Sequence, residues 1–344
     1  MEVEQGPWSL ADKIHHAWKT GGVPEVLSGC SRFLARKLVR PEYGFLLKSG
    51  PFTLIPGLEE GNPEAVAKAR SMLRMDMSRT YSIEGHCACL CGEDTDFTDV
   101  PAAVVAHWDP QKIVDPYVEY MCRQYKAMGW KVVLASASKP ERNEVLERWQ
   151  EWCDAIVYRT CDGYDFTSWK AALHCLPSLL HSEFLILCND SVFGPIGSLD
   201  AVHKKMATIQ CDFWGMTASR SIAPHLQSYY LVFSKKILRH KCFHEFFLYV
   251  NVENDRENSI KYEISIAIWI ALNKFKAGAY QIAKFNCIKR LDPTFYFWKG
   301  CIKNGMPFLK RRLNKYNKMI NIKSYSRYYD FQLINNYFKR TYTK

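Results

Sequence analysis

Apolar runs of strand length alternate with helix-like segments from about residue 100 onward. The strand-like runs cover residues 102–106, 132–135, 155–158 and 184–188. Between them, apolar positions recur at helical spacing over residues 117–128, 141–152 and 169–180. Runs that are apolar throughout suit the central strands of a parallel sheet, which is covered on both faces. The pattern therefore predicts an α/β fold with a Rossmann-type, mostly parallel sheet and helices on both faces.

The two ends of the chain lack this alternation. One face of a predicted N-terminal helix is apolar and carries Leu10, Ile14, Ala17 and Trp18. Such a face fits a helix that binds a membrane surface, and it equally fits a helix that packs on its own domain. We therefore divide the chain into a basic, partly amphipathic N-terminal region (1–98), an α/β domain (99–290) and a basic helical C-terminal extension (291–344).

Composition narrows the class of protein. Hydrophobic residues make up 48% of the chain and charged residues 24%, which excludes a disordered protein. The longest apolar stretch, residues 264–272, falls well short of the ~20 residues of a membrane span. Glu2 and Glu4 open the sequence, and no apolar leader segment follows them. We therefore expect a cytoplasmic protein.

The 13 cysteines are an odd number and are scattered along the chain. In a cytoplasmic protein they are expected to be reduced, and most of them to be small buried hydrophobic residues. A local cluster combines His86 with Cys87, Cys89 and Cys91. Because it lacks the C-x₂-C pair of a zinc site, we interpret it as a cysteine-rich loop.

The formal net charge of +11 is concentrated in the tail, where residues 299–344 hold twelve Lys or Arg against Asp330 alone. A basic face of this kind attracts an anionic partner such as phospholipid, lipid-linked phosphate or nucleic acid. A solvated surface without a partner has the same composition. The charge alone leaves these alternatives open.

Candidate chemistry lies where the predicted strands end, because ligands of open α/β sheets bind at the carboxyl ends of the strands. This rule selects His107, Asp109, Ser136, Ser138, the segment from Asp162 to Asp165, Asn189 and Asp190. The strongest local signal is the run 184–188, which leads into Asn189-Asp190-Ser191 and then the turn Gly194-Pro195. A carboxylate at such a strand end suits Mg²⁺ or Mn²⁺ held against a diphosphate. Asn-Asp is also common turn chemistry.

Several phrases occur in one order along the chain: Gly163-Tyr-Asp-Phe-Thr-Ser-Trp-Lys170, Asn189-Asp-Ser-Val-Phe-Gly-Pro195, Asp212-Phe-Trp-Gly215, His225-Leu-Gln-Ser-Tyr229 and Gly305-Met-Pro-Phe-Leu-Lys-Arg311. The series resembles the GT-A glycosyltransferases, and more narrowly the rhamnan synthesis protein F family of bacterial polysaccharide enzymes. The resemblance extends from about residue 100 to about residue 335. It implies that residues 99–290 form a GT-A-like glycosyltransferase domain.

The resemblance also implies roles for individual residues. Gly163, Asp165 and Lys170 are expected at the donor, together with the strand-end residues. Asp190 and Asn189 stand where the family group has a D-x-D motif that holds a divalent metal, although only one carboxylate is certain here. Glu263 is the expected general base, or else an acid placed in the first turn of its helix by the helix dipole. Trp214, His225, Gln227 and Tyr229 are expected to contact donor or acceptor, or to fill the core.

The resulting hypothesis is an inverting glycosyltransferase that moves a sugar from a nucleotide donor to a cell-surface polysaccharide or lipid-linked glycan. The resemblance implies dTDP-rhamnose as the leading donor. The acceptor would lie at the cytoplasmic face of the bacterial inner membrane, where the basic ends of the chain meet anionic lipid. Two alternatives belong to other classes. One is a non-catalytic scaffold subunit of a polysaccharide-synthesis complex, and the other is a nucleic-acid-binding protein, which the absence of a recognised nucleic-acid motif disfavours.

Overall fold

The computed structural model describes residues 47–139, 144–252, 256–284, 292–316 and 329–342. The predicted N-terminal apolar face (Leu10, Ile14, Ala17 and Trp18) and the basic segment 317–328 lie outside these ranges. Within them, no helix is both long and apolar enough to cross a membrane.

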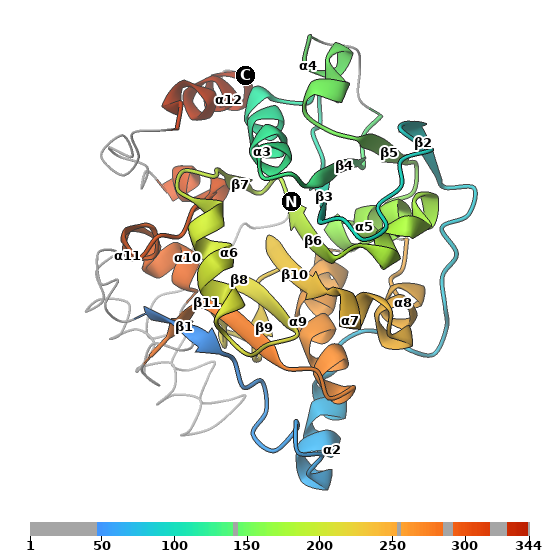
Figure 1. The fold of residues 1–344 in the computed structure, drawn as a ribbon, viewed down its shortest axis with the longest axis vertical. Coiled ribbons are helices and arrows are strands. Elements are labelled where there is room, and N and C mark those ends of the chain that lie inside the picture. Colours follow the sequence, from blue (N-terminus) through green and yellow to red (C-terminus); the bar gives the residue numbers. More distant parts are fainter. Residues whose placement is uncertain (1–46, 140–143, 253–255, 285–291, 317–328, 343–344) are drawn as a thin grey trace, which may run out of the picture.

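A large sheet runs through the molecule in the order β1-β11-β8-β10-β6-β3-β4-β5-β2, and β9 pairs with β8 (Figure 1). Its strands are β1 (Leu47–Pro51), β2 (Cys87–Cys91), β3 (Ala102–His107), β4 (Lys131–Ser136), β5 (Ala155–Arg159), β6 (Phe184–Asn189), β8 (Phe213–Ser219), β9 (His225–Leu226), β10 (Tyr230–Ser234) and β11 (Ala277–Ala283). A separate pair joins β7 (Val192–Phe193) to β12 (Leu309–Lys310).

The α/β class is confirmed, but the sheet is mixed rather than mostly parallel. β6, β3, β4 and β5 form a parallel core. β10 is antiparallel to both β6 and β8, and the edge strands β1 and β2 are antiparallel to their neighbours. An apolar run reveals burial but not strand direction, so the sequence pattern did not show these reversals. The two edge strands come from the N-terminal region, before residue 99.

Helices cover both faces of the sheet (Figure 1). On one face lie α2 (Pro63–Met72), α5 (Asp165–Cys175), α7 (Lys235–Leu238), α8 (Lys241–Leu248) and α9 (Arg256–Leu272). On the other lie α3 (Pro116–Ala127), α6 (Leu199–Ala207), α11 (Trp298–Lys303) and α12 (Phe331–Tyr342). Shorter helical elements are α4 (Glu144–Glu147), α10 (Pro293–Tyr296) and three 3₁₀ turns at Trp149–Glu151, Pro177–His181 and Arg311–Tyr316.

Strand β3 shows why the sheet is buried on both sides. Ala102, Val104 and Ala106 belong to the core on the α5 and α9 face. Ala103 and Val105 belong to the core on the α3 and α6 face. Successive side chains of a strand point to opposite faces, so a continuous apolar run supplies both cores.

Several predicted element bounds differ from the structure. Helix α5 begins at Asp165, four residues before the predicted start, and ends at Cys175 because Pro177 cannot continue it. In place of a helix over residues 141–152, the described residues form the short α4 and a 3₁₀ turn. The expected cysteine-rich loop is instead the edge strand β2. Helix α9 begins at Arg256, so Glu263 lies well inside it and not in its first turn.

Candidate functional site

The carboxyl ends of three parallel strands meet at one edge of the sheet. His107 at the end of β3 is paired with Ser136 at the end of β4. On its other side, Ala106 of β3 is paired with Asn189 of β6, and the backbone N–H of Asp190 donates to the Ala106 carbonyl at 3.0 Å. The structure therefore brings the predicted strand-end residues of β3, β4 and β6 together.

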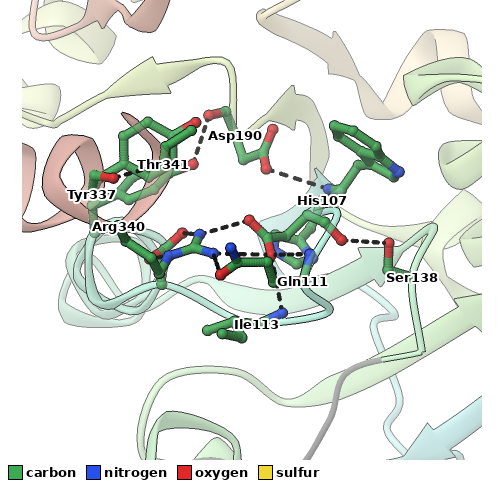
Figure 2. Close-up of polar contacts among 12 residues, drawn as sticks. His107, Gln111, Ile113, Ser138, Asp190, Tyr337, Arg340 and Thr341 are labelled. Carbon is green, nitrogen blue, oxygen red and sulfur yellow. Dashed lines mark hydrogen bonds and ion pairs between the residues drawn. The ribbon is translucent and has the colours of Figure 1, made fainter. Parts of the chain in front are cut away.

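Asp190 is a buried carboxylate that is held from both sides. Its Oδ2 accepts from the backbone N–H of Trp108 at 3.3 Å (Figure 2). Its Oδ1 lies 3.4 Å from Nη2 of Arg311. The hydroxyl of Tyr117 donates to its backbone carbonyl at 3.1 Å. The side chain of Asp190 is only 8% exposed, so these contacts fix its orientation.

Asn189 links the end of β6 to the start of α5. Its Nδ2 donates to Oδ2 of Asp165 at 2.5 Å, and its Oδ1 accepts from the backbone N–H and the hydroxyl of Ser191 at 3.1 and 2.6 Å. Burial and the nearby charge of Asp190 raise the pKa of Asp165 to about 6, although the bond from Asn189 opposes the shift. The carboxylates of Asp165 and Asp190 thus lie side by side in different environments.

The C-terminal extension adds two cations to this edge. Strand β12 pairs with β7 so that Lys310 lies opposite Val192, and the backbone N–H of Arg311 donates to the Ser191 carbonyl at 2.9 Å. Nζ of Lys310 lies 3.4 Å from Oγ of Ser191. Nη1 of Arg311 donates to the hydroxyls of Tyr117 and Tyr337 at 2.6 and 3.2 Å.

Glu263 reaches the same region from α9. Its Oε2 accepts from the backbone N–H of Ser228 at 2.8 Å and from the Ser228 hydroxyl. Its Oε1 lies 3.4 Å from Nε2 of His225. Because Tyr230 is paired with Cys188 across β10 and β6, Ser228 lies at the level of the residues that follow β6. The predicted base and the predicted metal-site residues therefore approach the same edge of the sheet.

The contact between Glu263 and His225 favours the charged form of both side chains. Burial would raise the pKa of Glu263, but the hydrogen bonds and charge of His225 and the bonds from Ser228 outweigh it and lower the pKa to about 2. Burial would lower the pKa of His225, but Glu263 and the Ala223 carbonyl outweigh it and raise the pKa. Nδ1 of His225 lies 2.7 Å from that carbonyl, which only accepts, so Nδ1 carries a proton.

Around His107 and Asp109 the structure forms a second polar group, closed by α12. Nδ1 of His107 lies 3.0 Å from Oγ of Ser136, and the Ser138 hydroxyl donates to the Asp109 carbonyl at 3.0 Å. Figure 2 shows Arg340 reaching from α12 toward this loop. It donates to Oδ2 of Asp109 at 2.6 Å and to Asp115. Burial lowers the pKa of His107 despite the nearby acids, so this ring is neutral at pH 7.

Other predicted site residues have structural partners. The Lys170 ammonium, expected at the donor, donates to the carbonyls of Tyr81 and Val250 at 2.5 and 2.7 Å. Trp214, expected at a sugar, packs in the core against His203 and Tyr230. The other three predicted residues, Gly163, Gln227 and Tyr229, lie nearer the carboxyl edge of the parallel strands. Gly163 precedes α5 and accepts from Arg159 at 2.8 Å through its carbonyl; Gln227 and Tyr229 are buried and share the hydroxyl of Thr217.

The donor set at Asp190 does not fit the divalent ion that the sequence implied. Such an ion needs free, hard oxygen ligands. Both carboxylate oxygens of Asp190 already have partners, one of them a guanidinium. The Asn189 amide presents its oxygen to Ser191 and its nitrogen to Asp165. Across the described ranges, no three His, Cys, Asp or Glu side chains are grouped so as to hold a metal ion.

The sequence did not lead us to expect Lys310, Arg311 and Arg340 as cations of this site. Lys310 and Arg311 stand in the phrase 305–311, which contributed to the resemblance, but their charge was counted with the surface of the basic tail. Arg340 was counted in the same way. One feature of the sequence could have indicated this position. Phe308 and Leu309, directly before Lys310, are apolar and buried, and an apolar strand-like pair indicates that its neighbours also lie close to the core.

Comparison with known proteins gives a family match over much of the chain. The model of the rhamnan synthesis protein F family matches residues 132–339, well over half of the chain. The chain belongs to the rhamnan synthesis protein F family. The matched segment reaches from β4 to α12 and therefore includes Asp190, Glu263, Lys310 and Arg311. Membership in the rhamnan synthesis protein F family indicates a role in polysaccharide biosynthesis.

Two curated relatives are more distant. The virulence protein VirA of Vibrio anguillarum is 23% identical over 198 residues, which cover 48% of this chain and 64% of VirA. The uncharacterized protein y4gN of Sinorhizobium fredii is 28% identical over 138 residues, which cover 39% of this chain and 36% of y4gN. The chain thus spans less than two thirds of either relative.

Proposed function

We propose that this rhamnan synthesis protein F family member is an inverting, GT-A-like glycosyltransferase. It would take a sugar from a nucleotide donor, with dTDP-rhamnose as the leading candidate, and add it to a lipid-linked glycan or cell-surface polysaccharide. The observation that carries the proposal is the convergence, at the carboxyl edge of the parallel strands, of five charged residues that are distant in sequence or in different elements: Asp165, Asp190, Glu263, Lys310 and Arg311. Donor binding at this edge follows the general rule for such sheets.

The reaction is a single displacement. The acceptor hydroxyl oxygen forms a bond to the anomeric carbon while the bond from that carbon to the diphosphate oxygen breaks. The electron pair of the broken bond stays on the diphosphate, and the acceptor proton passes to the Glu263 carboxylate. Ser228 and His225 orient Glu263 and keep it ionised. One carboxylate suffices because no covalent intermediate is formed.

The nucleoside end of the donor would lie near the polar group at His107, Ser136 and Asp109. A neutral imidazole and a serine hydroxyl both donate and accept, which suits the edge of a base or a ribose. Peripheral association with the cytoplasmic face of the bacterial inner membrane belongs to this proposal as well. It is supported by the basic composition of the tail and by the N-terminal apolar face, through attraction to anionic headgroups.

A binding screen followed by a transfer assay tests the proposal. The full chain is screened by thermal shift against dTDP-rhamnose, UDP-glucose and GDP-mannose, with the matching nucleoside monophosphates as controls. We expect one nucleotide sugar to raise Tm and its labelled sugar to enter a bacterial lipid-linked fraction. If no nucleotide sugar binds and no sugar is transferred, the proposal is wrong and a non-catalytic partner subunit becomes the better description.

A further inference from the structure

Lys310 places an ammonium in the site without a close counter-ion among the described residues. Its Nζ lies 3.4 Å from the Ser191 hydroxyl and 4.2 Å from the centre of the Tyr229 ring. Within the described part of the chain, no carboxylate forms an ion pair with it. An ammonium has three donors, and keeping it away from water without an anion is costly. The arrangement therefore leaves donors available for an anionic ligand.

The carboxylates that surround Lys310 are engaged elsewhere. Glu263, Asp292 and Asp165 all act on its charge, and they oppose the lowering of its pKa by burial. Glu263 accepts from Ser228, Asp292 accepts from Thr294 at 2.9 Å, and Asp165 accepts from Asn189. These partners hold the three acids in place. The three carboxylates therefore stabilise the Lys310 ammonium by charge at longer range, without a direct ion pair among the described residues.

Arg311 is the second fixed cation. Its guanidinium contacts Asp190 and the hydroxyls of Tyr117 and Tyr337, which orient its plane beside Lys310. A guanidinium carries five N–H donors in a rigid fork that matches phosphate geometry. The contacts with the described partners use Nη1 and Nη2. No described residue engages the Nε–H, which is therefore available to a ligand.

We propose that Lys310 and Arg311 bind the diphosphate of the donor in place of a divalent ion, so that the site works without metal. The inference rests on the proposed function and specifies how its donor is held. The two cations occupy the position at Asp190 where the sequence implied a metal. As the bond from the anomeric carbon to the diphosphate oxygen breaks, negative charge accumulates on the leaving diphosphate. A fixed ammonium and guanidinium then stabilise that charge.

Calorimetric titration of the full chain with inorganic pyrophosphate and with dTDP tests this inference. The titrations are run at constant ionic strength in EDTA and again in excess Mn²⁺ or Mg²⁺. We expect both probes to bind in EDTA, with affinities that the metals change by less than about threefold. Lys310→Met should weaken both probes by about tenfold or more, because it removes a charge-assisted hydrogen bond. Thymidine, which has no phosphate, serves as a probe that this substitution should not affect.

Three further variants test whether the loss of binding is specific to the positions and side-chain chemistry of Lys310 and Arg311. Arg312→Ala removes the same charge one residue further along, from an exposed side chain. Because this charge acts on Lys310 only at longer range, both affinities should change far less than in Lys310→Met. Lys310→Arg should retain most of the binding, because the charge persists. Arg311→Lys should weaken binding because it removes the fork. The wild-type titrations decide the metal question even if Lys310→Met does not fold.

The outcomes separate the inference from the proposed function. Binding of dTDP only in the presence of Mn²⁺ or Mg²⁺ would overturn the inference and leave the glycosyltransferase proposal standing. Wild-type affinity in both Lys310→Met and Arg311→Lys would also overturn it. If neither pyrophosphate nor dTDP binds with or without metal, both the inference and the proposed function fail.

Discussion

Gly194 lies against the backbone of Pro307. A β-carbon at Gly194 would come within 2.4 Å of the Pro307 carbonyl oxygen, and the glycine has a φ of +146°. The same carbonyl accepts from the backbone N–H of Ile196 at 2.7 Å. This close approach allows β12 to pair with β7, and that pairing places Lys310 and Arg311 beside Asp190.

Gly194→Ala should therefore damage both stability and the site. The added methyl meets backbone rather than a flexible side chain, and the φ is strained for any other residue, so we expect a loss of about 1–3 kcal/mol in unfolding free energy. Displacement of β12 should also weaken pyrophosphate binding. Urea unfolding and titration measure the two effects. Gly197→Ala is the matched control, since its β-carbon would have only ordinary contacts with Pro307 at 3.8 Å and beyond. Equal behaviour of the two variants would contradict this explanation.

The parallel core of the fold was predictable from the sequence because β3, β4, β5 and β6 are short apolar runs separated by helix-length segments. The antiparallel strands were not. β9 and β10 lie in a segment where His225, Gln227 and Ser228 interrupt the apolar pattern, and direction depends on tertiary pairing. The end of α5 was predictable in principle, since Pro177 stops a helix, but its start at Asp165 has no side-chain cap that the sequence could reveal.

The candidate site was predictable only in part. Asp190 and Asn189 follow from the strand-end rule, and Glu263 from the resemblance. Charge counts did not reveal the roles of Lys310, Arg311 and Arg340, because each has a partner more than one hundred residues away in the sequence. Counting charge treats every tail cation as surface charge, although these three turn inward. Tyr337, also in the tail, likewise turns inward and packs against Tyr117 and Phe193.

Arg340 should be a major stabilising contact of α12. It pairs with Asp109 and Asp115, whose side chains are each only 8% exposed. Arg340→Met leaves two buried carboxylates without their cation, which we expect to cost about 3–5 kcal/mol in unfolding free energy. Lys339→Ala, at an exposed position of the same helix, is the control and should change little. Asp115→Asn should restore part of the loss. No loss in Arg340→Met by urea unfolding would show that the pairing is not stabilising.

Asp190 and Arg311 should behave as one unit in pyrophosphate binding. Asp190→Asn keeps the size of the side chain and its contact with Trp108, but removes the charge that orients Arg311. We expect Asp190→Asn and Arg311→Lys each to weaken binding in EDTA, and the double variant to be no weaker than about the worse single variant, because contacting residues are not additive. If the losses of pyrophosphate affinity in the two single variants add fully in the double variant, Asp190 and Arg311 act independently.

Glu263→Gln tests the base. The amide preserves the shape of the side chain but removes the negative charge that accepts a proton. We expect turnover to fall by about 10²-fold or more, while the affinity for the nucleotide sugar stays nearly unchanged. Because Gln also loses the ionic contact with His225, circular dichroism and a melting curve must accompany the kinetics. A large loss of donor affinity with retained turnover of bound donor would make Glu263 a binding residue.

The pH dependence of kcat/KM distinguishes Glu263 from Asp165 as the base. A base must be deprotonated, so its activity declines as the pH falls through its pKa. The pKa of Glu263 is lowered to about 2, and therefore Glu263 contributes no acid limb over the range in which the protein is folded. The pKa of Asp165 is raised to about 6, and Asp165 as base would give a limb there.

We expect the profile to lack a limb near pH 6 that depends on Asp165. Comparing wild type with Asp165→Asn over pH 5–8 makes the test direct, since the amide cannot titrate. The unfolding free energies of wild type and Asp165→Asn give an independent measure of the ionisation of Asp165. Because the folded pKa of Asp165 lies above its ordinary value, the wild type should lose stability as pH rises through about 6, and Asp165→Asn should not. If wild-type kcat/KM falls tenfold per pH unit below about 6 and Asp165→Asn is inactive throughout, Asp165 is the base and Glu263 holds His225 in place.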